Sequence, residues 1–341
     1  MRCFHLFHGR WTRLSVLSVA AGALATVASM AAPSFAGTIT FGTDANQFNM
    51  EFVTIGNPGN AGDTNLVQDP AGAVGYTYDI GKFEVSEDMI EKYNANFGTA
   101  NSLVITKDTR DTNKPATGIS WNEAARFVNW LNTSTGGFAA YNLTTGGVND
   151  DIALWTASDT LDYDPLNPYR SKRATYVLPS WNEWYKAAYY DPNTSAYYYY
   201  ATGSDSAPTA VASGTTDNTA VYDQLFLQGP ADVTNAGGLS PYGVMGLGGN
   251  ADELEESSFD LANSSGSSDR VFRGGAWFDD SSSLASYTYS LDNPSIEFDH
   301  VGFRVASLSS SAPPAVPEPS MMVIGTLFGI GGLMAKRRMK K

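Results

Sequence analysis

Cysteine and histidine are almost absent from this chain. Among its 341 residues there is one cysteine, Cys3, and there are three histidines, His5, His8 and His300. Beyond the first eight residues, no disulfide or thiol chemistry is therefore available. Zinc, copper and haem sites built from Cys and His are not expected there either. A Ser-His-Asp or Cys-His catalytic set would have to depend on His300 alone.

Basic side chains are also scarce between residues 37 and 316. That stretch has 13 Lys and Arg against 34 Asp and Glu, which gives a net charge of about −21. Such a charge repels nucleic acid and anionic lipid, so nucleic acid is not an expected partner. The charge favours solubility and divalent cations, although a solvated acidic surface without any ligand explains most of it.

The first 36 residues have the composition of a secretory signal peptide. Three arginines precede an apolar run at 16–32, and the sequence SFA at 34–36 forms a small-x-small cleavage site. A transmembrane anchor is the alternative, but the run is short, interrupted by serine and followed directly by the processing site. We therefore expect residues 1–36 to be removed and the protein to be exported.

The last 25 residues combine three features in a fixed order. Pro317, Glu318 and Pro319 come first, then the mostly apolar stretch 321–335, then five Lys and Arg residues within 336–341. An apolar stretch of this length with basic residues behind it holds a chain in the inner membrane with the positive charge inside. The order resembles the PEP-CTERM sorting signal of Gram-negative bacteria, near whose Pro-Glu-Pro motif an exosortase is thought to cut.

This resemblance implies a route to the cell surface for residues 317–341. It implies an exosortase-type processing enzyme as a partner, a transient inner-membrane tether through 321–335, and release to the cell surface or extracellular matrix. A plain C-terminal anchor is the alternative. Residues 309–316, which include SSSAPP, have the composition of a flexible linker before this tail.

The remaining body, residues 37–308, is long enough for one large domain with a substantial core. Gly, Ser, Thr, Asn and Asp are spread along it with many aromatic residues between them, which indicates a compact, loop-rich fold. Helical periodicity begins at a serine suited to an N-cap in three places: 84–97 with Ser86, and 120–131 and 180–190 with the Ser-x-x-Glu capping-box spacing. Short strands are expected at 38–41, 76–83, 271–273 and 302–306.

Five blocks of sequence follow one another along this body. They are YDIGKFEVS at 78–86, PATGISWNEAARFVNWL at 115–131, YVLPSWNEWYKAAYY at 176–190, PYGVMGLGGNADEL at 241–254, and a segment at 273–306 that opens with RGGAW and ends just after GFR. Their content and order resemble the formylglycine-generating enzyme, or sulfatase-modifying factor, family over about residues 76–306. The resemblance implies an α+β fold of the C-type-lectin-like kind with little regular secondary structure.

The chain lacks the residues for this family's best-known chemistry. In its copper-dependent members, two cysteines five positions apart in the last block hold the metal and do the oxidation. Counted from Pro294 and Gly302, these positions fall on Ser281 and Ser286 here. A hydroxyl has too high a pKa and too little softness to bind Cu(I) as a thiolate does. The histidine triad of the iron-dependent relatives is missing too, so we do not expect formylglycine generation.

Calcium is the cofactor that the resemblance leaves open. In the family's Gly-Asn-x-x-Glu loop, backbone carbonyls and one carboxylate hold Ca²⁺. By position, these ligands would be the carbonyls of Gly249 and Ala251 and the carboxylate of Glu253. Gly246 stands where an Asp or Asn is usual, and Asp252 replaces a usual Trp. The additional acids of this loop either compensate as ligands or form only a solvated acidic turn.

The segment 278–293 is the best candidate for a functional surface. It is rich in Asp, Ser, Tyr and Asn, whose hydroxyls and aromatic faces make adaptable binding surfaces. In some C-type-lectin-like proteins, this segment is the ligand-binding face. Asp279, Asp280, Tyr287 and Tyr289 are therefore the candidate ligand-binding residues. An ordinary polar surface loop is the alternative.

Two functions from different classes follow. The first is an exported, non-catalytic binding or structural protein of the cell envelope or extracellular matrix, with a polysaccharide or another surface protein as its partner. The second is an enzyme with carboxylate chemistry on the same scaffold, in which adjacent acids such as Asp279 and Asp280 serve as acid and base. That requires burial to separate their pKa values. Adjacent acids are usually exposed, so the first function is favoured.

Overall fold

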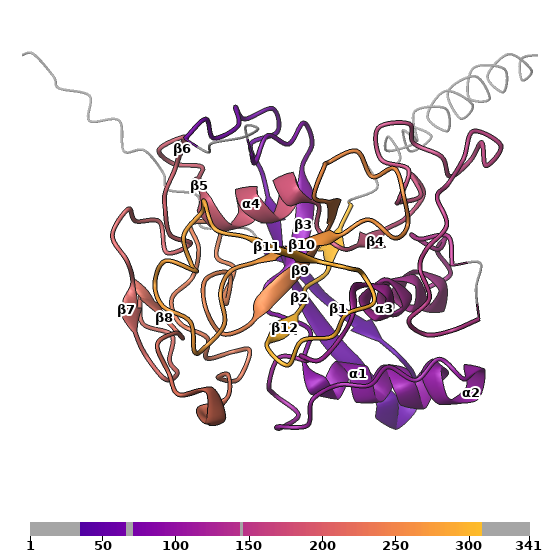
Figure 1. The fold of residues 1–341 in the computed structure, drawn as a ribbon, viewed down its shortest axis with the longest axis horizontal. Coiled ribbons are helices and arrows are strands. Elements are labelled where there is room, and N and C mark those ends of the chain that lie inside the picture. Colours follow the sequence, from indigo (N-terminus) through magenta and orange to yellow (C-terminus); the bar gives the residue numbers. More distant parts are fainter. Residues whose placement is uncertain (1–34, 66–70, 144–145, 309–341) are drawn as a thin grey trace, which may run out of the picture. The chain divides into compact units, whose positions relative to one another are not determined.

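The computed structural model describes residues 35–65, 71–143 and 146–308, and Figure 1 shows how they are arranged. The expected linker at 309–316, the sorting signal at 317–341 and all but the last two residues of the expected signal peptide lie outside the described residues. Within the described ranges, no helix has both the length and the apolar character needed to cross a bilayer.

A five-stranded antiparallel sheet lies at the centre of the fold, with the strand order β1-β2-β3-β13-β4. Its strands are β1 (Phe35–Phe41), β2 (Phe48–Ile55), β3 (Tyr78–Gly81), β13 (Ala306–Ser307) and β4 (Tyr176–Val177). Because β13 pairs with both β3 and β4, the end of the described chain is held inside this sheet.

A second sheet has the order β11-β10-β9-β12. It contains β11 (Ser290–Asp292), β10 (Arg270–Arg273), β9 (Asp252–Ser258) and β12 (Val301–Gly302), and β12 runs parallel to β9. Two short ribbons complete the strands: β5 (Tyr190–Asp191) with β6 (Ala196–Tyr197), and β7 (Thr209–Ala210) with β8 (Thr219–Ala220). The sequence did not predict the strand β9.

The helices begin at the serines that the sequence predicted. Ser86 accepts a hydrogen bond from the Met89 amide at the start of α1 (Glu87–Tyr93). Ser120 and Ser180 form complete capping boxes before α3 (Trp121–Ser134) and α4 (Trp181–Tyr189). The other helical segments are short: a π-helical segment at Asn94–Gly98, the helix α2 at Thr99–Asn101, and 3₁₀ turns at Asp44–Asn46 and Phe226–Gln228.

The core lies between the central sheet and helices α3 and α4. The indoles of Trp121 and Trp184 are completely buried in it. The strand β2, which the sequence did not predict, adds a row of buried apolar side chains, Phe48, Met50, Phe52, Val53 and Ile55. The mixed architecture with few helices and long loops is confirmed, and the expected strand at 302–306 is corrected to two short strands, β12 and β13.

Candidate functional site

The strand β9 contributes three glutamates to buried ion pairs. Its glutamates Glu253, Glu255 and Glu256 are completely buried, although the sequence placed them in a loop or a solvated turn. Each glutamate meets a buried arginine from another part of the chain, and the pairs are Glu253–Arg304, Glu255–Arg273 and Glu256–Arg170. Because each negative charge has a cationic partner, this acidic sequence can form an inner strand.

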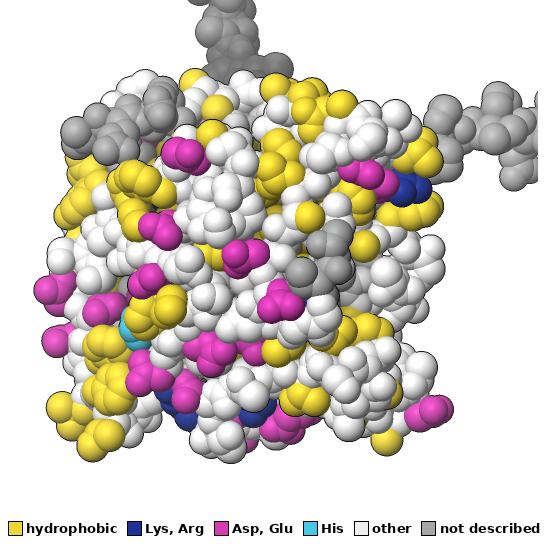
Figure 2. All heavy atoms as spheres, turned by 45° about the vertical axis from the view of Figure 1, so that its right-hand side comes forward, with side chains coloured by type: hydrophobic (Ala, Val, Ile, Leu, Met, Phe, Trp, Pro, Cys, Tyr) yellow, Lys and Arg dark blue, Asp and Glu magenta, His cyan; other side chains and the backbone are white. Residues whose placement is uncertain are grey.

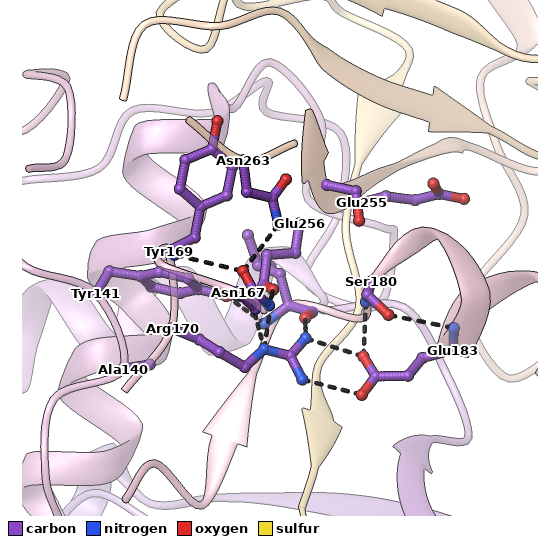
Figure 3. A network of polar contacts seen from close by, with 12 residues as sticks. Ala140, Tyr141, Asn167, Tyr169, Arg170, Ser180, Glu183, Glu255, Glu256 and Asn263 are labelled. Atoms are coloured by element: carbon purple, nitrogen blue, oxygen red, sulfur yellow. Dashed lines mark hydrogen bonds and ion pairs between the residues drawn. The ribbon is translucent and has the colours of Figure 1, made fainter. Parts of the chain in front are cut away.

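Arg170 joins β9 to the first turn of α4, as Figure 3 shows. Its Nη1 and Nη2 donate to the two oxygens of Glu183, each at 2.9 Å, and its Nε donates to Glu256 at 2.7 Å. The hydroxyl of Tyr141 also donates to Glu256, at 2.8 Å. Burial alone would raise the pKa of Glu183, but the charge and hydrogen bonds of Arg170 lower it below its ordinary value.

Arg304 and Trp184 occupy the carboxylate of Glu253. The guanidinium of Arg304 forms hydrogen bonds with both oxygens, with its Nε 2.5 Å from Oε2, and the indole of Trp184 donates to the same oxygen at 2.7 Å. Arg304 also donates to the carbonyls of Gly81 and Met245, both at 2.9 Å. Arg304 therefore has a structural role, in a buried ion pair with Glu253.

The residues expected to bind calcium do not fit that role as they are arranged. Glu253 would supply the only carboxylate of the expected set, and its oxygens already hold Arg304 and Trp184. The amide of Gly249 donates to the Gly274 carbonyl at 2.8 Å, which fixes the turn before β9. Within the part of the chain that the structure describes, no three His, Cys, Asp or Glu side chains are grouped to hold a metal ion.

Arg273 lies directly beneath the segment 278–293. Its Nε is 2.6 Å from Glu255, and its guanidinium stacks over the indole of Trp181 at 4.1 Å from the ring centre. The ring of Tyr289 is the outer neighbour of this cation, at 5.9 Å. Burial raises the pKa of Glu255 to about 7, against the opposing effect of Arg273. A buried cation therefore supports the aromatic rings above it.

Two candidate acids of this segment shape its turns. Asp279 accepts a hydrogen bond from the Ala276 amide at 2.8 Å, and exposed Asp280 accepts one from the Ser282 amide at 2.8 Å. The hydrogen bonds from Ser282 lower the pKa of Asp280. The two carboxylates thus stabilise separate local turns.

The two candidate tyrosines each form an aromatic pair at the surface. Tyr287 is 54% exposed, and its ring centre is 6.1 Å from that of Tyr199 in an edge contact. Tyr289 is half-buried and makes an edge contact with Trp181 at 5.1 Å, with Phe259 next to it at 6.2 Å. Trp181, Tyr199 and Phe259 come from distant parts of the chain, so the sequence alone did not connect them with this segment.

Ser281 and Ser286, the expected counterparts of the family's cysteines, differ in exposure. Ser281 is half-buried, whereas Ser286 is buried and its amide donates to the Tyr199 carbonyl at 2.9 Å. Ser286 thereby connects the segment 278–293 to the chain around Tyr199. These contacts hold the aromatic pair of Tyr199 and Tyr287 in place.

Comparison with solved structures shows the same fold in distant relatives. Variable protein 1 of Treponema denticola matches at 19% identity with a TM-score of 0.54, over 80% of this chain and 98% of that chain. A crystal structure of CarF matches at 19% identity with a TM-score of 0.56, over 76% of this chain and 98% of that chain. Identities this low show the fold alone.

Sequence comparison identifies the family. No match was found among curated proteins. Residues 43–308, more than half of the chain, match the sulfatase-modifying factor enzyme 1-like domain. This range includes β2, which precedes the five blocks recognised in the sequence, together with β9 and the segment 278–293. The chain therefore belongs to the family of sulfatase-modifying factor enzyme 1-like domains.

Proposed function

We propose that this protein is an exported, non-catalytic binding protein of the cell envelope or extracellular matrix. In this proposal the segment 278–293 and the aromatic side chains beside it hold a polysaccharide. The observation that carries the proposal is the pair of surface ring contacts, Tyr287 with Tyr199 and Tyr289 with Trp181. Tyrosine and tryptophan offer a large rigid face for stacking and a polar edge for hydrogen bonds, at low cost in conformational entropy.

The rings are supported from below, which favours binding without rearrangement. Trp181 lies on the guanidinium of Arg273, and Arg273 is fixed by its ion pair with buried Glu255. Tyr199 is fixed through the hydrogen bond that its carbonyl accepts from the Ser286 amide. A surface that is already in its binding conformation loses little entropy when a ligand arrives.

The alternative, an enzyme with carboxylate chemistry, has less support. A general acid at neutral pH needs a raised pKa, and the pKa of exposed Asp280 is lowered by Ser282. The Asp279 carboxylate is held by a backbone amide in its own turn. Ser281 and Ser286 stand at the expected positions of the family's two catalytic cysteines, which also favours a non-catalytic protein.

A polysaccharide array with the purified full-length protein in mild detergent tests this proposal. We expect binding to a defined glycan without turnover, and a loss of at least tenfold in affinity for Tyr287→Ala and Tyr289→Ala. The matched control is Phe138→Ala, because Phe138 is 50% exposed and packs on Arg173 instead. Cleavage of the bound glycan by the wild-type protein, or equal binding by all three variants, would contradict the proposal.

The sorting role of residues 317–341 is a further part of this proposal. Its support is the order of Pro317-Glu318-Pro319, the apolar stretch 321–335 and the basic end in the sequence. Deleting 317–341 should leave the protein in the periplasm of a bacterium with an exosortase, whereas the full chain reaches the surface. Equal surface display of both forms would rule out the sorting signal.

A further inference from the structure

A polar cleft lies between β2, the start of α1 and the loop at 233–234. It has a volume of about 370 Å³, within the range of roughly 300–1,000 Å³ that is typical of ligand sites. Phe48 and Met50 border it, but their side chains are buried in the core. Uncharged polar residues form much of the remaining wall: Gln47, Asn49, Ser86, Asn113 and Thr234. The cleft therefore suits a polar ligand.

The carboxylate of Glu84 is a buried member of this cleft. Glu84 lines the cleft and is only 1% exposed. Its Oε1 accepts a hydrogen bond from the Asn250 side chain at 2.8 Å, whereas its Oε2 has no hydrogen-bond partner among the residues that the structure describes. Buried polar atoms in folded proteins almost always have such a partner. Oε2 is therefore the atom at which a ligand of this cleft would bond.

The turn at Gly246 helps to fix this carboxylate in one position. Its φ is +74°, and an added Cβ would lie 2.9 Å from Oε2 of Glu84. The amide of Met245 donates to the Lys82 carbonyl at 2.9 Å, which holds the turn beside the chain just before Glu84. Because Asn250 and this turn hold the carboxylate from two sides, it is already placed for a ligand.

The basic side chains near Glu84 are engaged with other acids. Arg304 forms its ion pair with Glu253. Two further pairs lie at the rim of the cleft, Lys82–Glu51 at 3.2 Å and Lys92–Asp88 at 2.8 Å. A cation that pairs with Glu84 would therefore come from a ligand.

A cationic donor suits Glu84 better than a neutral one. Burial and nearby Glu253 raise its pKa to about 8, although Arg304 opposes this, so the carboxyl group of the free protein holds a proton at neutral pH. A cation can replace that proton, and a hydrogen bond between two charged groups is stronger than a neutral one. The body of about −21 attracts cations. Figure 2 shows Asp and Glu side chains spread over one face, with few Lys and Arg among them.

A metal ion by itself matches this cleft less well. Hard cations such as calcium take about six to eight oxygen ligands. In the described part of the chain, no three His, Cys, Asp or Glu side chains are grouped to hold one, and Oε1 of Glu84 already accepts a hydrogen bond from Asn250. The volume of the cleft suits an organic molecule that carries the charge.

We infer that this cleft binds an amino sugar, whose primary ammonium group donates to Oε2 of Glu84 while its hydroxyl groups bond to the polar walls. A lysine side chain would instead place its apolar four-carbon stem against those walls. None of the described residues 278–293 lines the cleft. The site is therefore separate from the proposed polysaccharide surface, and the inference does not depend on it.

Calorimetry with glucosamine and the full-length protein in mild detergent at pH 6.5 tests this site. We expect glucosamine to bind at least tenfold more tightly than glucose or N-acetylglucosamine, because both of these lack the ammonium group. Buffers of different ionisation enthalpy should show release of about one proton per bound glucosamine, since the ligand replaces the proton of Glu84. Equal affinity for the three sugars would overturn the inference, and so would tighter binding of Nα-acetyl-lysine amide.

The variant Glu84→Gln gives an independent readout, because it removes the charge and keeps an acceptor for Asn250. It should lose at least tenfold in affinity for glucosamine, together with the proton release. The matched control Glu297→Gln removes the same charge from another pocket and should bind as the wild type does, with urea unfolding to check that both variants are folded. Unchanged binding by Glu84→Gln would overturn the inference, as would calcium that binds through Glu84 and excludes glucosamine.

Discussion

Arg304 and Glu253 form a completely buried ion pair that links the chain just before β13 to the strand β9. Trp184 of α4 donates to the same carboxylate. The carboxylate of Glu253 thereby connects the second sheet both with the chain before β13, through the ion pair, and with the core helix α4, through the Trp184 hydrogen bond. Glu253 is also the glutamate that the family resemblance assigned to calcium. The local role of Glu253 is therefore to hold the fold together.

Removal of one member of this pair should be strongly destabilising. Arg304→Met leaves the Glu253 carboxylate buried without its cation, so we expect a loss of about 3–5 kcal/mol in the free energy of unfolding. The double variant with Glu253→Leu should lose much less than the two single losses added together. Urea unfolding measures all three. The partly exposed pair Lys92–Asp88 supplies the control, because Lys92→Met should cost at most ~1 kcal/mol.

Calcium should have little effect on stability. Because Arg304 and Trp184 occupy the Glu253 oxygens, millimolar CaCl₂ should shift the unfolding midpoint no more than the same concentration of MgCl₂ does. The comparison is made by thermal unfolding after treatment with a chelator. A midpoint that rises with calcium alone, and does so in a saturable way, would show that the folded protein binds the ion and would contradict this expectation.

Glu84 should make the stability depend on pH. Burial raises its pKa from 4.5 to about 8, and nearby Glu253 adds to this effect, while Arg304 and Asn250 oppose it. The folded state therefore keeps a proton that the unfolded state releases, so this stability is present below pH 4.5 and is lost as the pH rises to about 8.

Glu84→Gln isolates that contribution, because glutamine can still accept the hydrogen bond from Asn250. From pH 5 to pH 8, the variant should gain at least about 1 kcal/mol in unfolding free energy relative to the wild type, since each pKa unit corresponds to ~1.4 kcal/mol. Urea midpoints at several pH values measure the difference. A constant difference across that interval would show that Glu84 is ionised in the folded protein.

The turn at Gly274–Gly275 should tolerate no side chain at Gly275. Its φ is +76°, and an added Cβ would lie 2.9 Å from Leu284 and 3.2 Å from Ser283, both in the segment 278–293. Gly275→Ala should therefore cost about 1–3 kcal/mol and displace this segment. Thermal unfolding reports the cost. Gly136→Ala is the control, because its φ is +81° but nothing lies near its added Cβ. If both variants lose the same stability, the cost at Gly275 comes from backbone strain alone and not from contact with the segment 278–293.

Local signals in the sequence were sufficient for the helices and insufficient for β9. Ser120 and Ser180 act within three residues of chain, so their capping boxes could be predicted without knowledge of the fold. The acids of β9 depend on arginines that are 51 and 86 residues away in the pairs Glu253–Arg304 and Arg170–Glu256. From the sequence alone, such a run of acids is predicted to be solvent-exposed, because its distant arginine partners are not recognised.

The candidate surface was predictable in the same partial way. Composition pointed to Tyr287 and Tyr289, because both lie in a segment rich in hydroxyls and aromatic rings. Their partners Trp181 and Tyr199 are brought to them only by the packing of α4 and of the chain after β6. The sequence thus located half of each aromatic pair, and tertiary structure supplied the other half.

The most direct test of the account is a binding titration with the glycan that binds best on the array. Wild-type protein, Tyr287→Ala, Tyr289→Ala and the control Phe138→Ala are compared by calorimetry, with the unfolding midpoint of each measured in parallel. We predict that both tyrosine variants lose at least tenfold in affinity, that the control does not, and that the glycan is recovered intact. Glycan cleavage, or tyrosine variants that bind as tightly as the wild type, would contradict a binding role for the segment 278–293.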